Sequence, residues 1–191
     1  MSSPELITAI QKHDKAAKRT AFETYYGQLA AIASRYCKNQ TQADAVINSG
    51  FNACLQKLQN QRSPQIEDLG AFLEKEFILE CIAFIKNIRS EYYVSSTVHA
   101  SDAAASKNYN LFENNELIDF NNLDMEVLIN GLQQLVPSQR LIFNLHVIDG
   151  YSLPEAAAIL ESSEATVKSN LEKARYNFQK NIEKNLKHIK A

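Results

Sequence analysis

Apolar side chains recur at three- and four-residue steps along most of this chain, and this spacing constrains the fold more than any other feature. It places apolar groups on one face of an α-helix, which must then be buried against a neighbour. Before residue 95 the spacing predicts four helices. The first helix holds Leu6, Ile7 and Ile10. The second has the stripe Phe22, Tyr25, Leu29, Ala33 and Tyr36, and the third has Val46, Ile47, Phe51, Cys54, Leu55 and Leu58. The fourth has Leu69, Phe72, Leu73, Phe77, Ile82, Ile85 and Ile88.

The periodicity fails over residues 95–122, where Ser, Ala, Asn and acidic residues predominate. A connection this long is typical of a linker between domains or of a functional loop. Beyond it, stripes resume with Leu123, Val127, Leu128, Leu132 and Leu135, and, after Pro137, with Leu141, Ile142, Leu145 and Ile148. The chain is therefore predicted to be all-α, with two small helical domains, residues 1–94 and 123–191, joined by a flexible acidic linker over residues 95–122.

Composition agrees with a helical fold. Only 5 glycines and 4 prolines occur in 191 residues, which disfavours turn-rich β architectures and excludes collagen-like chains. The net charge of −2 is unpromising for a nucleic-acid-binding protein. The distribution of the charges changes this view, because residues 95–162 hold 2 basic and 9 acidic groups, whereas residues 163–191 hold 7 basic and 3 acidic groups.

Residues 152–182 have the pattern of a helix, a short turn and a second helix, and the C-terminal domain is predicted to contain a helix-turn-helix. Ser152 and Glu155 fit a capping box, and Ser163 can cap the second helix. Val167, Leu171, Ala174, Phe178 and Ile182 have core-facing spacing on that second helix. Short polar and basic side chains then point outward near its N-terminus, as major-groove reading requires. A helical hairpin with a solvated basic face explains the same spacing equally well.

At these residues the chain resembles the C-terminal domain of extracytoplasmic-function (ECF) sigma factors. The resemblance runs from Asn130 to Lys180, and the run from Phe143 to Ser152 is especially similar to family members from Bacteroidetes. It implies that the domain binds the minus-thirty-five promoter element with the second helix in the major groove. The implied DNA-binding residues are Ser163, Glu164, Thr166, Lys168, Ser169, Asn170, Lys173 and Arg175.

The N-terminal half is similar to the first domain of the same family, through Phe22–Tyr26, Arg35-Tyr36, Asn39, Asp44, Phe51 and Gly70–Leu73. This resemblance implies a sigma factor that binds core RNA polymerase and promoter DNA and directs transcription initiation. The implied polymerase-binding residues are Asp44, Asn48 and Phe51. The implied contacts to the melted minus-ten strand are Lys86, Arg89, Tyr92 and Tyr93. An anti-sigma factor is a further partner that the resemblance leaves open.

Two departures from the family pattern motivate an alternative. Ala45 and Ser49 stand where acids are common in the docking helix. Glu74, Glu76 and Glu80 stand where the family is commonly basic, and each carboxylate near a phosphate is repulsive. The alternative is a sigma-like DNA-binding regulator, or a partner-sequestering protein, that no longer initiates transcription.

An enzyme is the third class, and the sequence offers little for it. The four histidines are isolated, and neither a Gly-rich phosphate loop nor a nucleophile-elbow motif occurs. Cys37, Cys54 and Cys81 lie far apart and are predicted to be buried reduced thiols. We expect no catalytic residue, no metal and no cofactor. With no signal-like N-terminus and no apolar stretch long enough for membrane insertion, a cytoplasmic location is expected.

Overall fold

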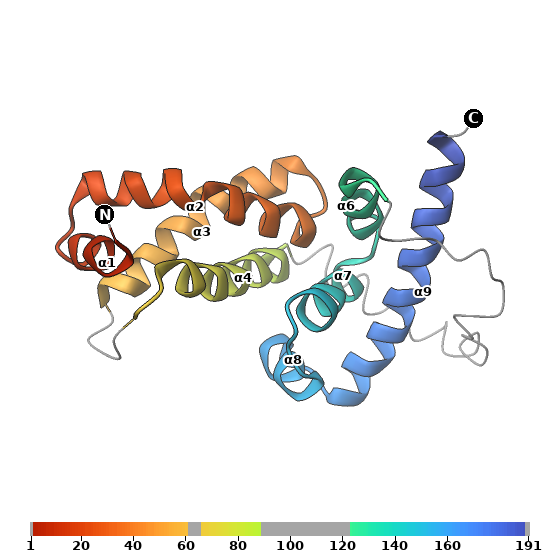
Figure 1. Ribbon diagram of the computed structural model, residues 1–191. Helices are drawn as coiled ribbons and strands as arrows, with labels where there is room; N and C mark the ends of the chain where they lie inside the picture. The colour runs from red at the N-terminus through yellow and green to blue at the C-terminus, as the bar shows by residue number, and fades with distance from the viewer. Residues whose placement is uncertain (1, 61–65, 89–122, 190–191) are drawn as a thin grey trace. The chain divides into compact units, whose positions relative to one another are not determined.

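The computed structural model describes residues 2–60, 66–88 and 123–189, and every regular element in these ranges is helical (Figure 1). The chain forms two compact units, divided between Phe84 and Ile85. The elements are α1 (Ser3–Gln11), α2 (Lys15–Tyr36), α3 (Gln40–Asn60), α4 (Leu69–Asn87), α6 (Met125–Gln133), α7 (Pro137–Phe143), the π-helix η3 (Asn144–Ile148), α8 (Leu153–Leu160) and α9 (Glu164–Ile189). The predicted all-α class is confirmed for these residues, and the predicted linker lies outside them.

Polar side chains fix where the helices begin. Asp14 accepts hydrogen bonds from the backbone N–H groups of Ala16 and Ala17, at 2.7 and 3.2 Å, and so caps α2. Asp68 does the same for α4 through the N–H of Gly70, at 2.8 Å. Asp124 caps α6 in the same way. Each carboxylate satisfies donors that have no partner within their own helix.

The first unit buries most of the four predicted apolar stripes, while Ile85 and Ile88 of the fourth stripe follow the division between the units. Leu6, Ile7 and Ile10 of α1 are buried, as are all six residues of the α3 stripe. Helices approach closely at glycines: a Cβ built on Gly50 of α3 would lie 2.9 Å from the Phe77 ring of α4. The same Cβ on Gly70 would lie 2.9 Å from the ring of Tyr25. Glycine at these positions lets α4 pack onto α2 and α3.

The second unit is built around α9, against which α6, α7 and α8 pack. Its core cluster consists of Val127, Leu132, Leu135, Phe143, Ala174, Phe178 and Ile182. The buried Arg140 guanidinium donates to the carbonyl oxygens of Gln133 and Leu135, at 3.2 and 2.7 Å, and thereby satisfies the C-terminal end of α6. Asn177 of α9 donates to the buried Gln139 side chain at 2.9 Å, which fixes α7 on α9.

One predicted core residue is exposed. The stripe through Leu141, Ile142 and Leu145 is buried, but Ile148 is 46% exposed. The cause is η3, in which the Asp149 N–H donates five residues back to the Asn144 carbonyl, at 2.9 Å. A π-turn holds more residues than an α-turn, so Ile148 is rotated off the core-facing side. Gly150 then adopts φ 77°, the left-handed conformation expected of a glycine after a helix end.

Within the described ranges, no helix combines the length and hydropathy that spanning a membrane requires.

Candidate nucleic-acid and polymerase interfaces

The connection between α8 and α9 is held at both ends by side-chain hydrogen bonds. Ser152 and Glu155 form the predicted capping box at the start of α8, where the Glu155 carboxylate accepts from the Ser152 N–H at 2.8 Å. Hydrogen bonds from the Ser152 side chain and backbone lower the pKa of Glu155, so this contact is charge-assisted at neutral pH. At the start of α9, Ser163 Oγ accepts from the Thr166 N–H at 3.1 Å.

The turn itself contains a left-handed residue other than glycine. Glu161 has φ 54° and ψ 45° and ends α8, and its N–H donates to the Ala158 carbonyl at 3.2 Å. Ser162 donates its N–H to the Ala157 carbonyl at 3.0 Å. The three residues Glu161–Ser163 therefore redirect the chain from α8 into α9, and the backbone N–H groups of Glu161 and Ser162 are both hydrogen-bonded.

The N-terminal half of α9 divides into a buried and an exposed side, as the sequence predicts. Val167, Leu171 and Ala174 are buried. Two of the candidate DNA-binding residues, Asn170 and Lys173, are half-buried. The other six are exposed: Ser163, Glu164, Thr166, Lys168, Ser169 and Arg175. This side thus offers hydroxyl groups near the helix start with cations beside them, which suits contact with base edges and phosphates.

Two of the three candidate polymerase-binding residues lie on the exposed side of α3. Asp44 and Asn48 are exposed, and Asn48 Nδ2 donates to the Asp44 backbone carbonyl at 3.0 Å. Phe51 is only 6% exposed, and its ring packs edge-on against Phe22, with centroids 5.1 Å apart. Phe51 belongs to the core of the first unit, so it supports α3 from beneath.

The acids of α4 are held by residues of the neighbouring helices. Lys57 Nζ of α3 lies 2.9 Å from a carboxylate oxygen of Glu76 and 2.9 Å from one of Glu80. The side chains of these two acids are only 18% and 24% exposed. Glu74 accepts a hydrogen bond from Gln28 of α2 at 2.9 Å. Two carboxylates in α4 therefore share one ammonium group.

The pKa values of Lys57 and of the nearby thiols are shifted in this ion-pair cluster. Burial by itself lowers the pKa of Lys57, but hydrogen bonds to Glu80 and Glu76 outweigh it, and the net effect is a raised pKa. Burial, helped by the charge of Glu80, raises the pKa of the Cys54 thiol to about 12. Burial also raises the pKa of the Cys81 thiol. Cys37, Cys54 and Cys81 are buried free thiols, as predicted.

The family model described as ECF sigma factor matches residues 2–184, which include helices of both units. The chain belongs to the ECF sigma factor family. It is a sigma factor, a regulatory transcription protein whose partners are core RNA polymerase and promoter DNA.

Two solved structures are similar to this sigma factor. One is the sigma factor RpoE in complex with the anti-sigma factor NepR from Bartonella quintana, which is 20% identical, with 86% of this chain and 96% of that chain covered and a TM-score of 0.49. The other is CnrH in complex with the cytosolic domain of CnrY, which is 18% identical, with 95% of this chain and 97% of that chain covered and a TM-score of 0.45. No protein with curated annotation matches the sequence.

Sequence reasoning missed Lys57 of this sigma factor, because 19 residues separate it from Glu76 and no short-range rule connects them. Lys86 lies in the last turn of α4. Arg89, Tyr92 and Tyr93 lie outside the described residues. Within the ranges that the structure describes, no group of three or more His, Cys, Asp or Glu is arranged to hold a metal ion.

Proposed function

We propose that this sigma factor reads two promoter elements with its two helical units, while one face of α3 docks on core RNA polymerase. The observation that carries the proposal is the family match over residues 2–184, because it includes the helices to which each task is assigned. The proposal keeps the domains at residues 1–94 and 123–191, with a linker over 95–122. It also places the protein in the cytoplasm of a bacterium related to Bacteroidetes.

In the second unit, α8, the turn and α9 act as a helix-turn-helix on the minus-thirty-five element. Thr166 and Ser169 support this role, because their short exposed side chains let the helix come close to base edges. Lys168 and Arg175 are exposed cations that can reach phosphates. Ser163, Glu164, Asn170 and Lys173 complete the proposed surface, the last two from the edge of the core.

In the proposed domain at residues 1–94, the C-terminal end of α4 and the residues after it contact the melted minus-ten strand. Lys86 would pair with phosphates, together with Arg89. Tyr92 and Tyr93 would stack on unpaired bases, each stack being worth about 1–3 kcal/mol.

Polymerase docking is assigned to α3, where Asp44 and Asn48 are available to a partner. Phe51 acts indirectly, by anchoring α3 on Phe22. An anti-sigma factor that covers one of these surfaces is a further proposed partner, and an adjacent gene for a membrane protein of the anti-sigma type would support it.

The alternative, a sigma-like protein that no longer initiates, is motivated by the acids of α4. The ion pairs reduce the support for this alternative, because Lys57 neutralises part of the charge of Glu76 and Glu80. Glu74, which is exposed, is the acid to test. If it is inhibitory, Glu74→Gln raises promoter melting, whereas Lys75→Gln, a matched change at the next position of α4, does not.

The decisive experiment is run-off transcription with cognate core polymerase across genomic fragments. We expect transcripts from a small set of promoters, lost in a Thr166→Ala, Ser169→Ala double variant that still binds polymerase. A purified, folded protein that neither binds core polymerase nor supports initiation from any fragment would contradict the proposal.

A further inference from the structure

α9 carries lysines along the side that faces away from the core of the second unit. Lys173, Lys180 and Lys184 follow Thr166 and Ser169 at steps of three, four and seven residues, which place all five on one side of a helix. The buried residues of α9 lie on the opposite side. Lys180 and Lys184 are exposed, and Lys173 is half-buried. We call Lys173, Lys180 and Lys184 the lysine row.

The acids of this part of α9 lie away from the lysine row. Glu172 and Glu183 each precede a lysine of the row by one residue, and one residue turns the helix by about 100°. Glu183 accepts a hydrogen bond from Gln179 Nε2 at 3.1 Å, which holds its carboxylate on a different side from the row. Within the described ranges, neither Lys173 nor Lys184 takes part in an ion pair. The row therefore presents positive charge to a partner.

Tyr176 positions the central lysine of the row. Lys180 Nζ lies 4.4 Å from the centroid of the Tyr176 ring, which is a cation–π contact. Tyr176 is half-buried and lies one turn before Lys180 on the same side of α9. A lysine side chain that is already restrained loses less rotamer freedom when it binds a partner.

The length of α9 places the end of the row beyond the base edges. At about 1.5 Å per residue, Lys180 lies about 21 Å and Lys184 about 27 Å from Thr166 along the helix axis. The major groove is about 12 Å wide, so a helix with Thr166 at the base edges carries these two lysines outside the groove. The groups that DNA presents there are phosphates, which suit a lysine ammonium group.

We propose that Lys180 and Lys184 bind phosphates of the duplex that flanks the minus-thirty-five element, with Lys173 at the edge of the groove. This inference rests on the proposed role of α9 as the recognition helix. DNA is the partner committed to, because the row continues the side of α9 that holds Thr166 and Ser169. Part of the promoter affinity then comes from DNA outside the recognised sequence and is independent of base identity.

The test is a titration of the holoenzyme, assembled from the full-length protein and core polymerase, with a promoter found by run-off transcription. In matched fragments, neutral methylphosphonate linkages replace phosphates on the upstream or the downstream flank of the minus-thirty-five element. Neutral linkages on one flank should weaken wild-type binding about tenfold. The Lys180→Gln, Lys184→Gln double variant should bind ordinary DNA about tenfold more weakly, with the slope of log affinity against log salt reduced by about 2. The neutral linkages should weaken its binding no further.

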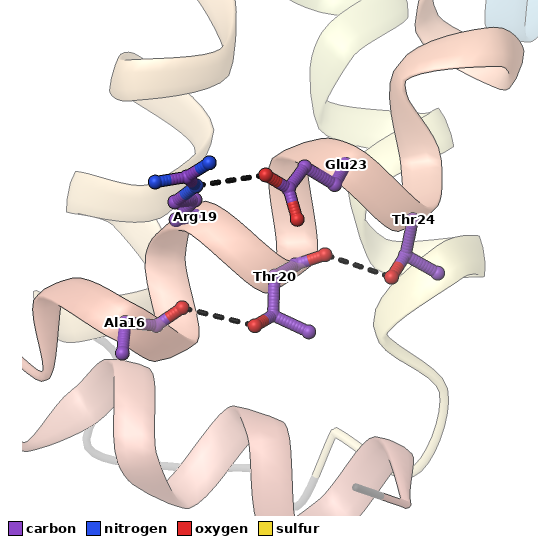
Figure 2. Close-up of polar contacts among 5 residues, drawn as sticks. All are labelled: Ala16, Arg19, Thr20, Glu23 and Thr24. Atoms are coloured by element: carbon purple, nitrogen blue, oxygen red, sulfur yellow. Dashed lines mark hydrogen bonds and ion pairs between the residues drawn. The ribbon is translucent and has the colours of Figure 1, made fainter.

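Two further variants serve as controls. Lys180→Arg, Lys184→Arg keeps both charges and should retain the wild-type affinity and slope. Lys12→Gln, Arg19→Gln also removes two exposed cations, but from the first unit, and should change neither value. Figure 2 shows Arg19 on α2 with its partner Glu23, at 2.8 Å. Circular dichroism confirms that each variant is folded.

Failure of the proposed function and failure of the lysine row give different results. If the holoenzyme binds no promoter fragment, the proposed function fails. If it binds, but the glutamine variant keeps the wild-type affinity and slope, or neutral linkages on neither flank weaken wild-type binding, the row does not bind phosphates and the recognition helix stands. If the glutamine variant loses affinity for core polymerase while its assembled holoenzyme binds DNA as before, the row contacts protein and the inference is overturned.

Discussion

Lys57 shows how much a single residue can change the interpretation of others. In the sequence, Glu74, Glu76 and Glu80 form an acidic group at the wrong place for contact with DNA. In the folded chain, Glu76 and Glu80 share the Lys57 ammonium group and are mostly covered. Removing Lys57 would leave two carboxylates close together with no counter-charge, which is unfavourable for partly buried acids. Lys57 therefore holds α4 to α3 and reduces the negative charge of α4.

The Cys54 thiol makes the stability of the first unit sensitive to alkaline pH. Its pKa is raised from 9.0 to about 12, chiefly by burial. Above pH 9.0 the thiol ionises in the unfolded chain but stays protonated in the folded chain. The part of the free energy of unfolding that this difference supplies below pH 9.0 is therefore lost as pH rises toward 12. We expect urea midpoints to fall between neutral pH and about pH 10. Cys54→Ala should be less stable at neutral pH but show a shallower fall, and a fall equal to that of the wild type would contradict the assignment.

Glu161 is strained by its left-handed backbone, and glycine should relieve the strain. An L-residue in this conformation costs roughly 1–2 kcal/mol, part of which is offset by the greater freedom of glycine in the unfolded chain. The substitution also removes the ion pair between Glu161 and Lys86, at 3.3 Å, which contributes little because the Glu161 side chain is exposed. Glu161→Gly should therefore raise the free energy of unfolding of the second unit by up to about 1 kcal/mol in urea denaturation. Ser162→Gly changes the neighbouring turn residue, which has no positive φ, and should give no gain. Equal effects of the two variants would contradict this explanation.

Among the helices of the described residues, η3 is the one that periodicity does not reveal. Its residues continue the apolar pattern of α7, yet the wider π-turn exposes Val147 and Ile148, at 45% and 46%. The segment then ends with His146 Nδ1 donating to the Tyr151 carbonyl at 2.7 Å and with Gly150 in the left-handed region. These contacts set the point at which the chain enters α8.

Some glycines in the helices lie against side chains of another helix and others do not. Alanine substitution should have opposite effects on stability at the two kinds of position. A Cβ on Gly131 of α6 would lie 2.7 Å from Ile182 Cδ1 and 3.0 Å from a Phe178 ring carbon. Gly131→Ala should therefore destabilise the second unit by about 1–3 kcal/mol. Gly27 of α2 has no atom within 4 Å of such a Cβ. Gly27→Ala should stabilise the first unit by about 0.5–1 kcal/mol through helix propensity alone. Thermal denaturation of both variants tests the pair, and a stabilising Gly131→Ala would show that α6 and α9 are not tightly packed there.

Charge is divided along the chain between the two proposed interactions. The net charge of −2 combines an acidic middle with residues 163–191, which hold 7 basic and 3 acidic groups. The exposed side of α3, by contrast, is nearly neutral. DNA binding that uses lysines and arginines releases counterions and weakens steeply with salt. The two steps, polymerase docking and promoter contact, should therefore respond differently to ionic strength.

A Lys168 variant tests whether this lysine contributes to the salt dependence of promoter binding. If it contacts a phosphate, Lys168→Gln should weaken promoter binding nearly uniformly across sequences and reduce the slope of log affinity against log salt by about 1. Lys12→Gln, at an exposed position at the end of α1, should leave the slope unchanged. The measurement is a DNA-binding titration of the full-length protein over a series of salt concentrations. An unchanged slope in Lys168→Gln would remove this residue from the proposed surface.

Spacing along the chain predicts the α-helices, the caps at Ser152 and Ser163 and most of the buried residues. The capping box of Ser152 and Glu155, the cap at Ser163 and the apolar stripe of α9 are confirmed as predicted. The folded chain alone reveals which side chains of different helices meet and which of them face solvent. Phe51 is buried against Phe22, Lys57 pairs with acids of another helix, and η3 turns Ile148 to solvent. A regular period records only local geometry, whereas pairing between helices depends on how their faces pack.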